Sequence, residues 1–165
     1  MTQFSEDTPL DVTIRPAAID DLAAIFHLGE KLFRPREVSN LYRTWDEYEV
    51  TGLFNSEPEY MLVAEVADAL VGFALGSVIE KAGTAWNYGH LVWLGVEEAY
   101  ARQGVASLLF DKFTELMKQK GVRMLMVDTQ ADNDKAIRFF EKKGFTNPID
   151  HVYMTLNLET WEENP

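Results

Sequence analysis

The chain has 165 residues, of which 47% are hydrophobic and 25% charged, and its formal net charge at pH 7 is −12. This composition is typical of a soluble globular domain, and no apolar run is long enough to cross a bilayer. The charge argues against nucleic acid, whose phosphates would be repelled, and suits cationic partners such as amines, although solubility is the simpler explanation. Because the chain has no cysteine, disulfides, thiolate metal sites and cysteine nucleophiles are excluded.

Alternating and helical spacings of apolar residues predict strands and helices that follow one another along the chain. The predicted strands are residues 12–15, 60–66, 70–79, 90–96, 123–129, 145–149 and 151–158. The predicted helices begin after Asp20 or Asp21 and end at Pro35, span 44–54, run from 105 to Gly121, and run from Asp132 or Asn133 to Gly144. Hairpins in the first half and alternating helices and strands after residue 90 predict a mixed sheet.

The strand predicted at 70–79 has one bulky and one small face. Val71, Phe73 and Leu75 alternate with glycine and alanine, and a short turn around Asp68 joins this strand to the preceding one. A small face suits close packing against a helix or a ligand.

The ends of the chain carry little structural signal. Residues 1–11 are polar and acidic and lack the pattern of a secretory signal, which favours a cytoplasmic protein. No repeat, low-complexity tract or linker divides the sequence. We therefore predict one domain over residues 1–165, with frayed tails at 1–10 and 159–165.

A turn of small residues joins the strand at 90–96 to the helix that begins near Val105. Backbone N–H groups from Arg102 to Ser107 would point at one place in front of the helix N-terminus, an arrangement that binds phosphate. Gly104 allows a ligand to approach the backbone, and Ala106 is too small to block it. An ordinary helix start also uses small residues, so the turn alone leaves both interpretations open.

This turn and a later segment resemble the acetyl-CoA-binding core of the GCN5-related N-acetyltransferases (GNAT). The family's loop, Gln/Arg-x-x-Gly-x-Gly/Ala, is matched at Gly104 and Ala106, but Ala101 stands at its first position. The later motif, Asn-x-x-Ala-x-x-x-Tyr-x-x-x-Gly-Phe, has Phe140 in place of its tyrosine. Its matching positions are Asn133, Ala136, Gly144 and Phe145.

The resemblance implies a fold and a coenzyme site. The fold is α/β (α+β), a mixed and mostly antiparallel sheet with helices on both faces, whose splayed fourth and fifth strands hold the pantetheine arm and thioester. The implied coenzyme-binding residues are Leu94, Gly95, Val96, Arg102, Gln103, Gly104, Val105, Ala106, Ser107, Asn133 and Phe140. A plain buried strand at 94–96 and a helix cap at Asn133 are the structural alternatives.

Acetyl transfer to an amine requires a base, because amines near pKa 10 are mostly protonated at neutral pH. Asp128 is the first candidate, because it lies twelve residues before Phe140, as does the catalytic glutamate of the ribosomal-protein N-terminal acetyltransferases in this family. Many other members have a glutamate where this chain has Val92, so His90, two residues earlier, is the second candidate. A surface carboxylate and a structural histidine are the alternatives.

Phe140 replaces the tyrosine whose hydroxyl protonates the leaving thiolate in the family. A thiol of pKa about 8.5 still leaves as thiolate at pH 7 at a cost of roughly 2 kcal/mol. The resemblance therefore implies a slower enzyme, a water in place of the hydroxyl, or another donor such as Tyr153 or Tyr88.

We predict an acetyl-CoA-dependent N-acetyltransferase that works by direct transfer and without a metal. The alternative is a non-catalytic acyl-CoA-binding or interaction domain on the same fold. The family's first two helices and last two strands line the acceptor site, which here includes residues 34–37 and 42–49, where aromatics and carboxylates could hold a cationic amine. Core packing of the aromatic residues and a solvated acidic face explain these two runs equally well. The sequence does not name the acceptor, and although homodimers are common in the family, it does not fix the oligomeric state.

Overall fold

The computed structural model describes residues 9–33, 44–83 and 85–162 and divides into two compact units. The first unit extends to Val127, and the second begins at Asp128. The single domain expected over 1–165 stays a prediction, and most of the two expected frayed tails lie outside the described residues. No helix within these three ranges is long and apolar enough to cross a membrane.

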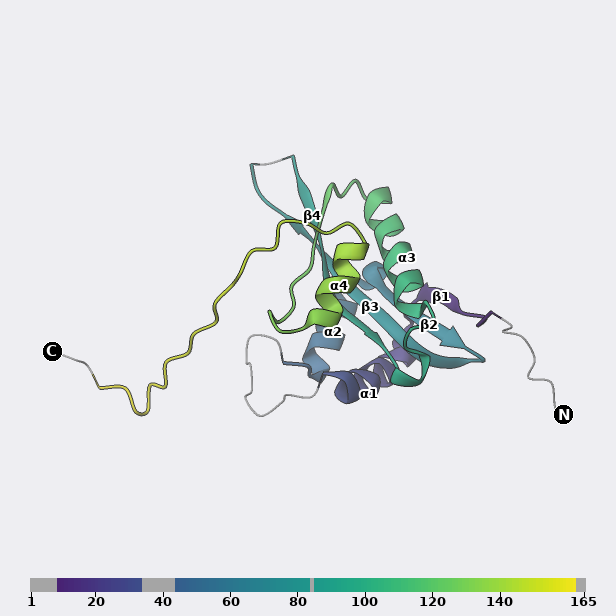
Figure 1. Ribbon diagram of the computed structural model, residues 1–165, viewed down its shortest axis with the longest axis horizontal. Helices are drawn as coiled ribbons and strands as arrows, with labels where there is room; N and C mark the ends of the chain where they lie inside the picture. The colour runs from purple at the N-terminus through teal and green to yellow at the C-terminus, as the bar shows by residue number, and fades with distance from the viewer. Residues whose placement is uncertain (1–8, 34–43, 84, 163–165) are drawn as a thin grey trace. The chain divides into compact units, whose positions relative to one another are not determined.

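A five-stranded sheet forms the centre of the first unit, with its strands in chain order (Figure 1). They are β1 (Thr13–Pro16), β2 (Met61–Val66), β3 (Ala69–Glu80), β4 (Asn87–Val96) and β5 (Met124–Met126). The first four strands pair antiparallel, and β5 pairs parallel to β4. The predicted mixed, mostly antiparallel sheet is therefore confirmed.

The hairpin between β2 and β3 has the turn that the sequence predicts. Ala67 and Asp68 both have positive φ, 48° and 63°. Two residues with positive φ form the two-residue turn whose twist matches that of the flanking strands. This hairpin fixes which face of β3 carries its bulky side chains.

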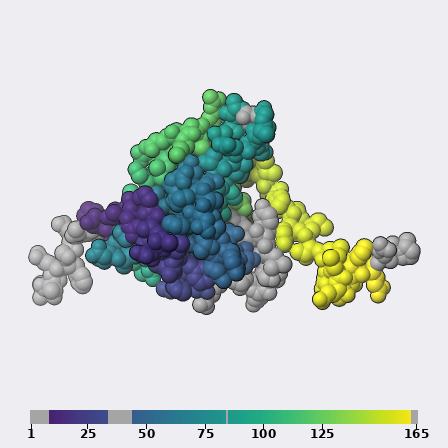
Figure 2. Space-filling model, turned by 180° about the vertical axis from the view of Figure 1, so that it is seen from behind, coloured from purple at the N-terminus to yellow at the C-terminus, as the bar shows by residue number. Residues whose placement is uncertain are grey.

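Helices cover both faces of the sheet, as expected. In the first unit these are α1 (Leu22–Leu32) and α2 (Glu47–Ser56) on one face and α3 (Val105–Gln119) on the other. The second unit contains α4 (Asp134–Lys142). The bulky face of β3 packs with Ile25 of α1 and Val50 of α2 in one apolar core. Figure 2 shows the side on which the purple α1 segment and the blue α2 segment lie next to each other.

The small face of β3 packs against α3. A Cβ on Gly76 would lie 2.3 Å from ring carbons of Phe113 and 2.8 Å from the carbonyl oxygen of His90. A Cβ on Gly72 would lie 3.2 Å from Leu109. The alternation of bulky and small residues on β3 therefore lets two layers of helices approach one strand.

Helix α1 begins directly after Asp21, as predicted, and Asp21 is its N-cap residue, but no side-chain bond caps the helix. Neither Asp20 nor Asp21 caps α1 with its side chain; the carboxylate of Asp21 instead accepts hydrogen bonds from both terminal nitrogens of Arg15, at 2.7 and 2.9 Å, and from the amide of Ala18. Arg15 also binds Glu65 on β2. The guanidinium lowers the pKa of Asp21 below its ordinary value of 3.8.

Two predictions for the C-terminal region are also wrong. Residues 145–149 and 151–158 form no strand, although their side chains alternate, and Val152, Met154 and Leu156 are 76%, 85% and 60% exposed. An alternating pattern stabilises a strand only where a neighbouring strand supplies hydrogen bonds and side-chain contacts. The fifth strand is also shorter than the predicted 123–129, so Asp128 follows it rather than lying on it.

Candidate functional site

The strand β4 has an open edge at its C-terminal end. β5 pairs with it only at Tyr88, Gly89 and His90, whereas β4 continues to Val96. Along residues 91–96, no strand of the described chain pairs with β4 on the side of β5. Because β5 ends at Met126, β4 has an unpaired edge beyond His90, and the splay expected between the fourth and fifth strands stays a prediction.

The register of β3 and β4 decides which backbone groups face this open edge. The amide of Glu97 donates to the carbonyl of Val71 at 2.8 Å, so these two residues form a hydrogen-bonded antiparallel pair. Because such pairs alternate with pairs whose polar groups point outward, Gly95 turns its N–H toward β3. Leu94 and Val96 turn their N–H and C=O groups toward the open edge.

Gly95 has a packing role of its own. A Cβ at this position would lie 2.8 Å from Leu32 and 3.3 Å from Phe33, at the end of α1. The glycine therefore lets α1 approach the strand closely, which explains the residue without reference to a ligand.

A β-bulge lies next to the open edge. Leu75 pairs with Trp93 and Gly76 pairs with Leu91, so Val92 is an extra residue in β4. Bulges bend the bulged strand and are common beside active sites. His90, the last residue of β4 that pairs with β5, is half-buried two positions before Val92.

The turn after β4 has the backbone geometry of an anion-binding loop. Arg102 and Gly104 have positive φ, 62° and 83°, and Gln103 between them does not. Alternation of this kind turns successive amides toward one point. The first bond of α3 runs from the amide of Leu108 to the carbonyl of Gly104, so the amides of residues 105–107 have no carbonyl partner within the helix. All of these amides lie at the positive end of the α3 dipole.

Gly104 is required by its dihedral angle and not by packing. A Cβ on it would meet nothing within 4 Å, so the space in front of this backbone is open. The side chain of Gln103 donates to the carbonyl of Ala99 at 3.0 Å and helps to hold the turn.

In the second unit, Asn133 caps α4. Its Oδ1 accepts from the amide of Ala136 at 3.2 Å, and its Nδ2 donates to Oγ1 of Thr129 at 3.1 Å. The helix cap expected as an alternative is therefore present, and a contact of Asn133 with the coenzyme stays a prediction.

Phe140 belongs to the C-terminal cap of α4. The amide of Phe145 donates to the carbonyl of Phe140 at 3.0 Å, Gly144 has a φ of 97°, and the two phenyl rings lie 5.4 Å apart. These are the parts of a Schellman motif with its hydrophobic contact. The Gly-Phe end of the later motif thus has a structural reason as well.

The family model described as the acetyltransferase (GNAT) family matches residues 22–145. This chain belongs to the GNAT family. Its relatives include N-alpha-acetyltransferase 30 of Schizosaccharomyces pombe, 27% identical over 134 residues that cover 81% of this chain and 83% of the relative.

Solved GNAT structures share the fold. The NatC complex bound to Gag peptide and CoA superposes with a TM-score of 0.73 at 19% identity, covering 85% of this chain and 87% of the other. An aminoglycoside acetyltransferase from an uncultured soil sample, in complex with trehalose, superposes at 0.71 with 22% identity, covering 88% and 97%. GNAT proteins use acetyl-CoA, which carries the pyrophosphate and thioester that the loop and strand edge would receive.

The predicted GNAT site residues divide between the two units. Those of β4 and of the turn at 101–107 belong to the first unit, whereas Asp128, Asn133 and Phe140 belong to the second. Asp128 is exposed. Within the ranges that the structure describes, no group of three or more histidine, cysteine, aspartate or glutamate side chains could hold a metal ion.

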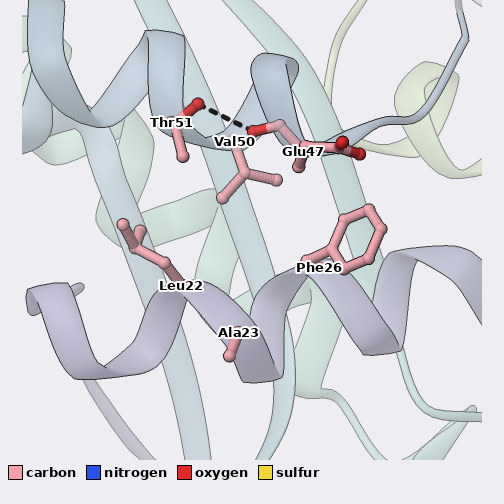
Figure 3. Close-up of a pocket in the computed structure, with 6 residues that line it drawn as sticks. All are labelled: Leu22, Ala23, Phe26, Glu47, Val50 and Thr51. Carbon is pink, nitrogen blue, oxygen red and sulfur yellow. Dashed lines mark hydrogen bonds between the residues drawn. The ribbon is translucent and has the colours of Figure 1, made fainter.

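An apolar cavity of about 180 Å³ lies between α1 and α2 (Figure 3). None of its lining residues comes from β4 or from the turn at 101–107, so it is separate from the coenzyme groups of the first unit. The side chains that line it are Leu22, Ala23, Phe26, Glu47, Val50 and Thr51.

On the α1 and α2 side of the sheet, one carboxylate of this GNAT chain reaches β4. Oε2 of Glu49 accepts a hydrogen bond from the indole nitrogen of Trp93 at 3.1 Å. Glu49 falls in the run 42–49 expected near the acceptor, but its partner was not predicted, because 44 residues separate the two and no local pattern joins them. Residues 34–43 of the expected acceptor region lie outside the described residues.

Proposed function

We propose that this GNAT protein transfers an acetyl group from acetyl-CoA directly to a primary amine, without a metal. The observation that carries the proposal is the loop at 101–107, with its alternating φ signs, placed directly after the open edge of β4. In acetyl-CoA the pantetheine arm links the pyrophosphate to the thioester, so their two sites must lie along one path, and a loop that directly follows the strand edge fits this requirement.

The loop would hold the pyrophosphate. Backbone amides from Arg102 to Ser107 supply N–H donors, the α3 dipole adds favourable charge, and the hydroxyl of Ser107 and the guanidinium of Arg102 can contribute further contacts. The residue Ala101, which replaces a polar residue of the family motif, removes one side-chain contact and leaves these backbone donors in place.

The open edge of β4 would hold the pantetheine arm as an added strand, with Leu94 and Val96 as its backbone partners. The same alternation that turns Gly95 toward β3 leaves the amides of these two residues available to the thioester. An N–H donated to the thioester oxygen stabilises the negative charge that develops there as the amine attacks.

The proton of the ammonium would pass to Asp128, with His90 as the second candidate, directly or through a water. The neutral amine nitrogen then forms a bond to the carbonyl carbon, and the carbon–sulfur bond breaks to release coenzyme A as thiolate. The nitrogen loses its second proton to solvent water as the amide forms. Phe140 cannot protonate that thiolate, whose release costs about 2 kcal/mol at pH 7 without a donor. Tyr153 and Tyr88 remain candidate donors.

The similar proteins suggest two classes of acceptor. One is a peptide, as in N-alpha-acetyltransferase 30 and the NatC complex bound to Gag peptide, and the other is an aminoglycoside. We expect a cytoplasmic enzyme that takes a small amine or a protein terminus. Phe140 and Val92 favour the second candidate function, a protein that binds acyl-CoA without turnover. Thiol release from acetyl-CoA over a panel of amines separates the two, since a binding domain releases none with any amine.

The coenzyme site is tested by Gly104→Glu. The new side chain would project toward the pyrophosphate and repel it, so calorimetry should show the affinity for coenzyme A falling at least tenfold with the fold intact.

The matched control is Gly121→Glu. Gly121 also has a positive φ, 76°, and open space around it, at the other end of α3. The two variants share the backbone strain and the added charge, so only the first should lose affinity. Equal affinities in both variants would place the coenzyme elsewhere.

A further inference from the structure

We infer that Glu49 is a specificity-determining residue that binds a second cationic group of the acceptor, distinct from the nitrogen that is acetylated. The inference rests on the proposed acetyl transfer and narrows its substrate class to amines that carry at least two positive charges.

The position of Glu49 follows from its hydrogen bond to Trp93. Trp93 lies on β4 immediately before Leu94, whose amide faces the open edge. The indole N–H holds the Glu49 carboxylate at 3.1 Å. A residue of α2 is thereby fixed beside the strand that would receive the thioester.

The two substrates would lie on opposite faces of the sheet, with the coenzyme phosphates on the α3 side and the acceptor on the α1 and α2 side. The turn at 101–107 leads into α3, which packs on the small face of β3 at Gly72 and Gly76. Trp93 belongs to the core on the opposite face, with α1 and α2. A coenzyme whose phosphates lie at the N-terminus of α3 therefore leaves the α1 and α2 face of β4 for the acceptor, and Glu49 lies on that face.

The charge of Glu49 exceeds what the local packing needs. Trp93 is 8% exposed and its ring lies 4.8 Å from that of Phe33 and 5.1 Å from that of Trp45. A neutral amide would satisfy its indole N–H at a lower desolvation cost than a carboxylate. Within the described ranges, no lysine or arginine forms an ion pair with Glu49. Among the described residues the half-buried carboxylate thus has no cationic partner, and a cation on the acceptor would compensate its charge.

The surrounding sequence has the same character. From Thr44 to Glu80 the chain contains eight carboxylates and no lysine, arginine or histidine. Arg15 neutralises Glu65. The α2 region therefore attracts cations, and the indole bond singles out Glu49 among its carboxylates.

The matched control is Glu59, in the short helix η3 (Pro58–Tyr60) that follows α2. Like Glu49 it belongs to the acidic stretch from Thr44 to Glu80, but it is exposed and lies outside the run 42–49 expected near the acceptor. The variants Glu49→Gln and Glu59→Gln therefore compare the same chemical change at two places.

The experiment measures acetyl transfer to α,ω-diamines of increasing length and to monoamines with the same carbon chains. Glutamine can still accept the indole hydrogen bond, so Glu49→Gln should fold normally. We expect kcat/KM for the preferred diamine to fall at least tenfold, with the KM for acetyl-CoA and the rate for the monoamine within twofold of the wild type. Glu59→Gln should change the rate with neither amine by more than twofold, and Glu49→Asp should recover part of the diamine rate.

A calorimetric measurement makes the test independent of turnover. In the presence of coenzyme A, the wild-type protein should bind the diamine more tightly than the monoamine, and Glu49→Gln should abolish the difference. Equal binding of the two amines by the wild type, or equal effects of Glu49→Gln on both, would overturn the inference. A wild type that prefers the diamine but releases no thiol would defeat the proposed function and leave the cation site standing.

Discussion

The two units of this chain differ in how their residues are held. Up to Val127, side chains such as Phe73 and Phe113 are fully buried, and α3 alone buries five residues. From Asp128 on, no described residue is buried, and α4 buries none. The first unit has a buried apolar core, whereas the second unit shows caps at the two ends of α4.

Most predicted coenzyme-binding residues lie in the first unit, where the loop at 101–107 and the edge of β4 take their shape from a packed sheet and from α3. Asp128, the first candidate base, and the predicted coenzyme residues Asn133 and Phe140 lie in the second unit, near the caps of α4. Changes in packing should therefore lower stability most in the first unit, and the change at Asp128 should lower turnover with little effect on stability.

The largest expected effect comes from Gly76→Ala. Its Cβ would overlap the Phe113 ring and the carbonyl of His90, so the free energy of unfolding should fall by about 3 kcal/mol. Gly144→Ala in the second unit meets open space and should cost only about 1 kcal/mol, through its positive φ. Urea denaturation measures both. Equal losses would contradict the contrast between the two units.

The next effect concerns Asp128→Asn. If Asp128 removes the amine proton, kcat should fall about 100-fold, with the affinity for coenzyme A unchanged and a flatter pH dependence on the acid side. Asp132→Asn, at an exposed aspartate nearby, is the control and should leave kcat within about threefold. If Asp128→Asn also changes kcat by less than about threefold, Asp128 is not the general base, and His90 or a chain of waters removes the proton instead.

A smaller effect is expected for Arg15→Met, which removes the ion pairs to Asp21 and Glu65. Because these groups are only partly exposed, we expect a loss of about 1–2 kcal/mol at pH 7. The pKa of Asp21 is lower in the folded protein than its ordinary 3.8, so its contribution is present above that pH and is lost as the pH falls through the folded value.

Chemical denaturation from pH 7 down to pH 3 would follow this difference. The difference in stability between the wild type and the variant should begin to shrink as the pH falls below about 3.8 and should vanish only below the folded pKa of Asp21. A loss that stays constant over this range would show that packing of the arginine stem, and not its charge, stabilises β1. Lys143→Met in the second unit should cost no more than about 0.5 kcal/mol.

The smallest expected effect is that of Phe140→Tyr. A hydroxyl beside the coenzyme sulfur should raise thiol release about three- to tenfold, most at low pH, where expelling an unprotonated thiolate is hardest. A wild type that is already fast and is slowed by the tyrosine would refute this account and favour another donor such as Tyr153. A protein that only binds acyl-CoA would release no thiol in either form.

The sequence predicts the local parts of this fold well. The alternation of Val71, Phe73 and Leu75 with small residues predicts a strand with a bulky and a small face, and the structure places a helix against the small one. The turn at Asp68 and the C-terminal cap at Gly144 also follow from nearby residues. In each case the interactions that decide the structure lie within a few residues of one another.

The contacts that join distant parts of the chain could not be predicted. The bond between Glu49 and Trp93 and the register that turns Leu94 and Val96 outward depend on how separate elements pack. The alternation in residues 151–158 predicts a strand that the structure lacks, because the pattern specifies a strand's faces but cannot supply its neighbour.

The open edge of β4 also bears on how this protein must be handled. Residues 91–96 read Leu-Val-Trp-Leu-Gly-Val, an uncharged segment without proline, and such segments with unsatisfied backbone groups serve as templates for cross-chain pairing and aggregation. A pantetheine arm bound along this edge would occupy those backbone groups. Preparations stripped of coenzyme are therefore expected to aggregate sooner than saturated ones, and coenzyme A should be kept in the buffer from lysis onward.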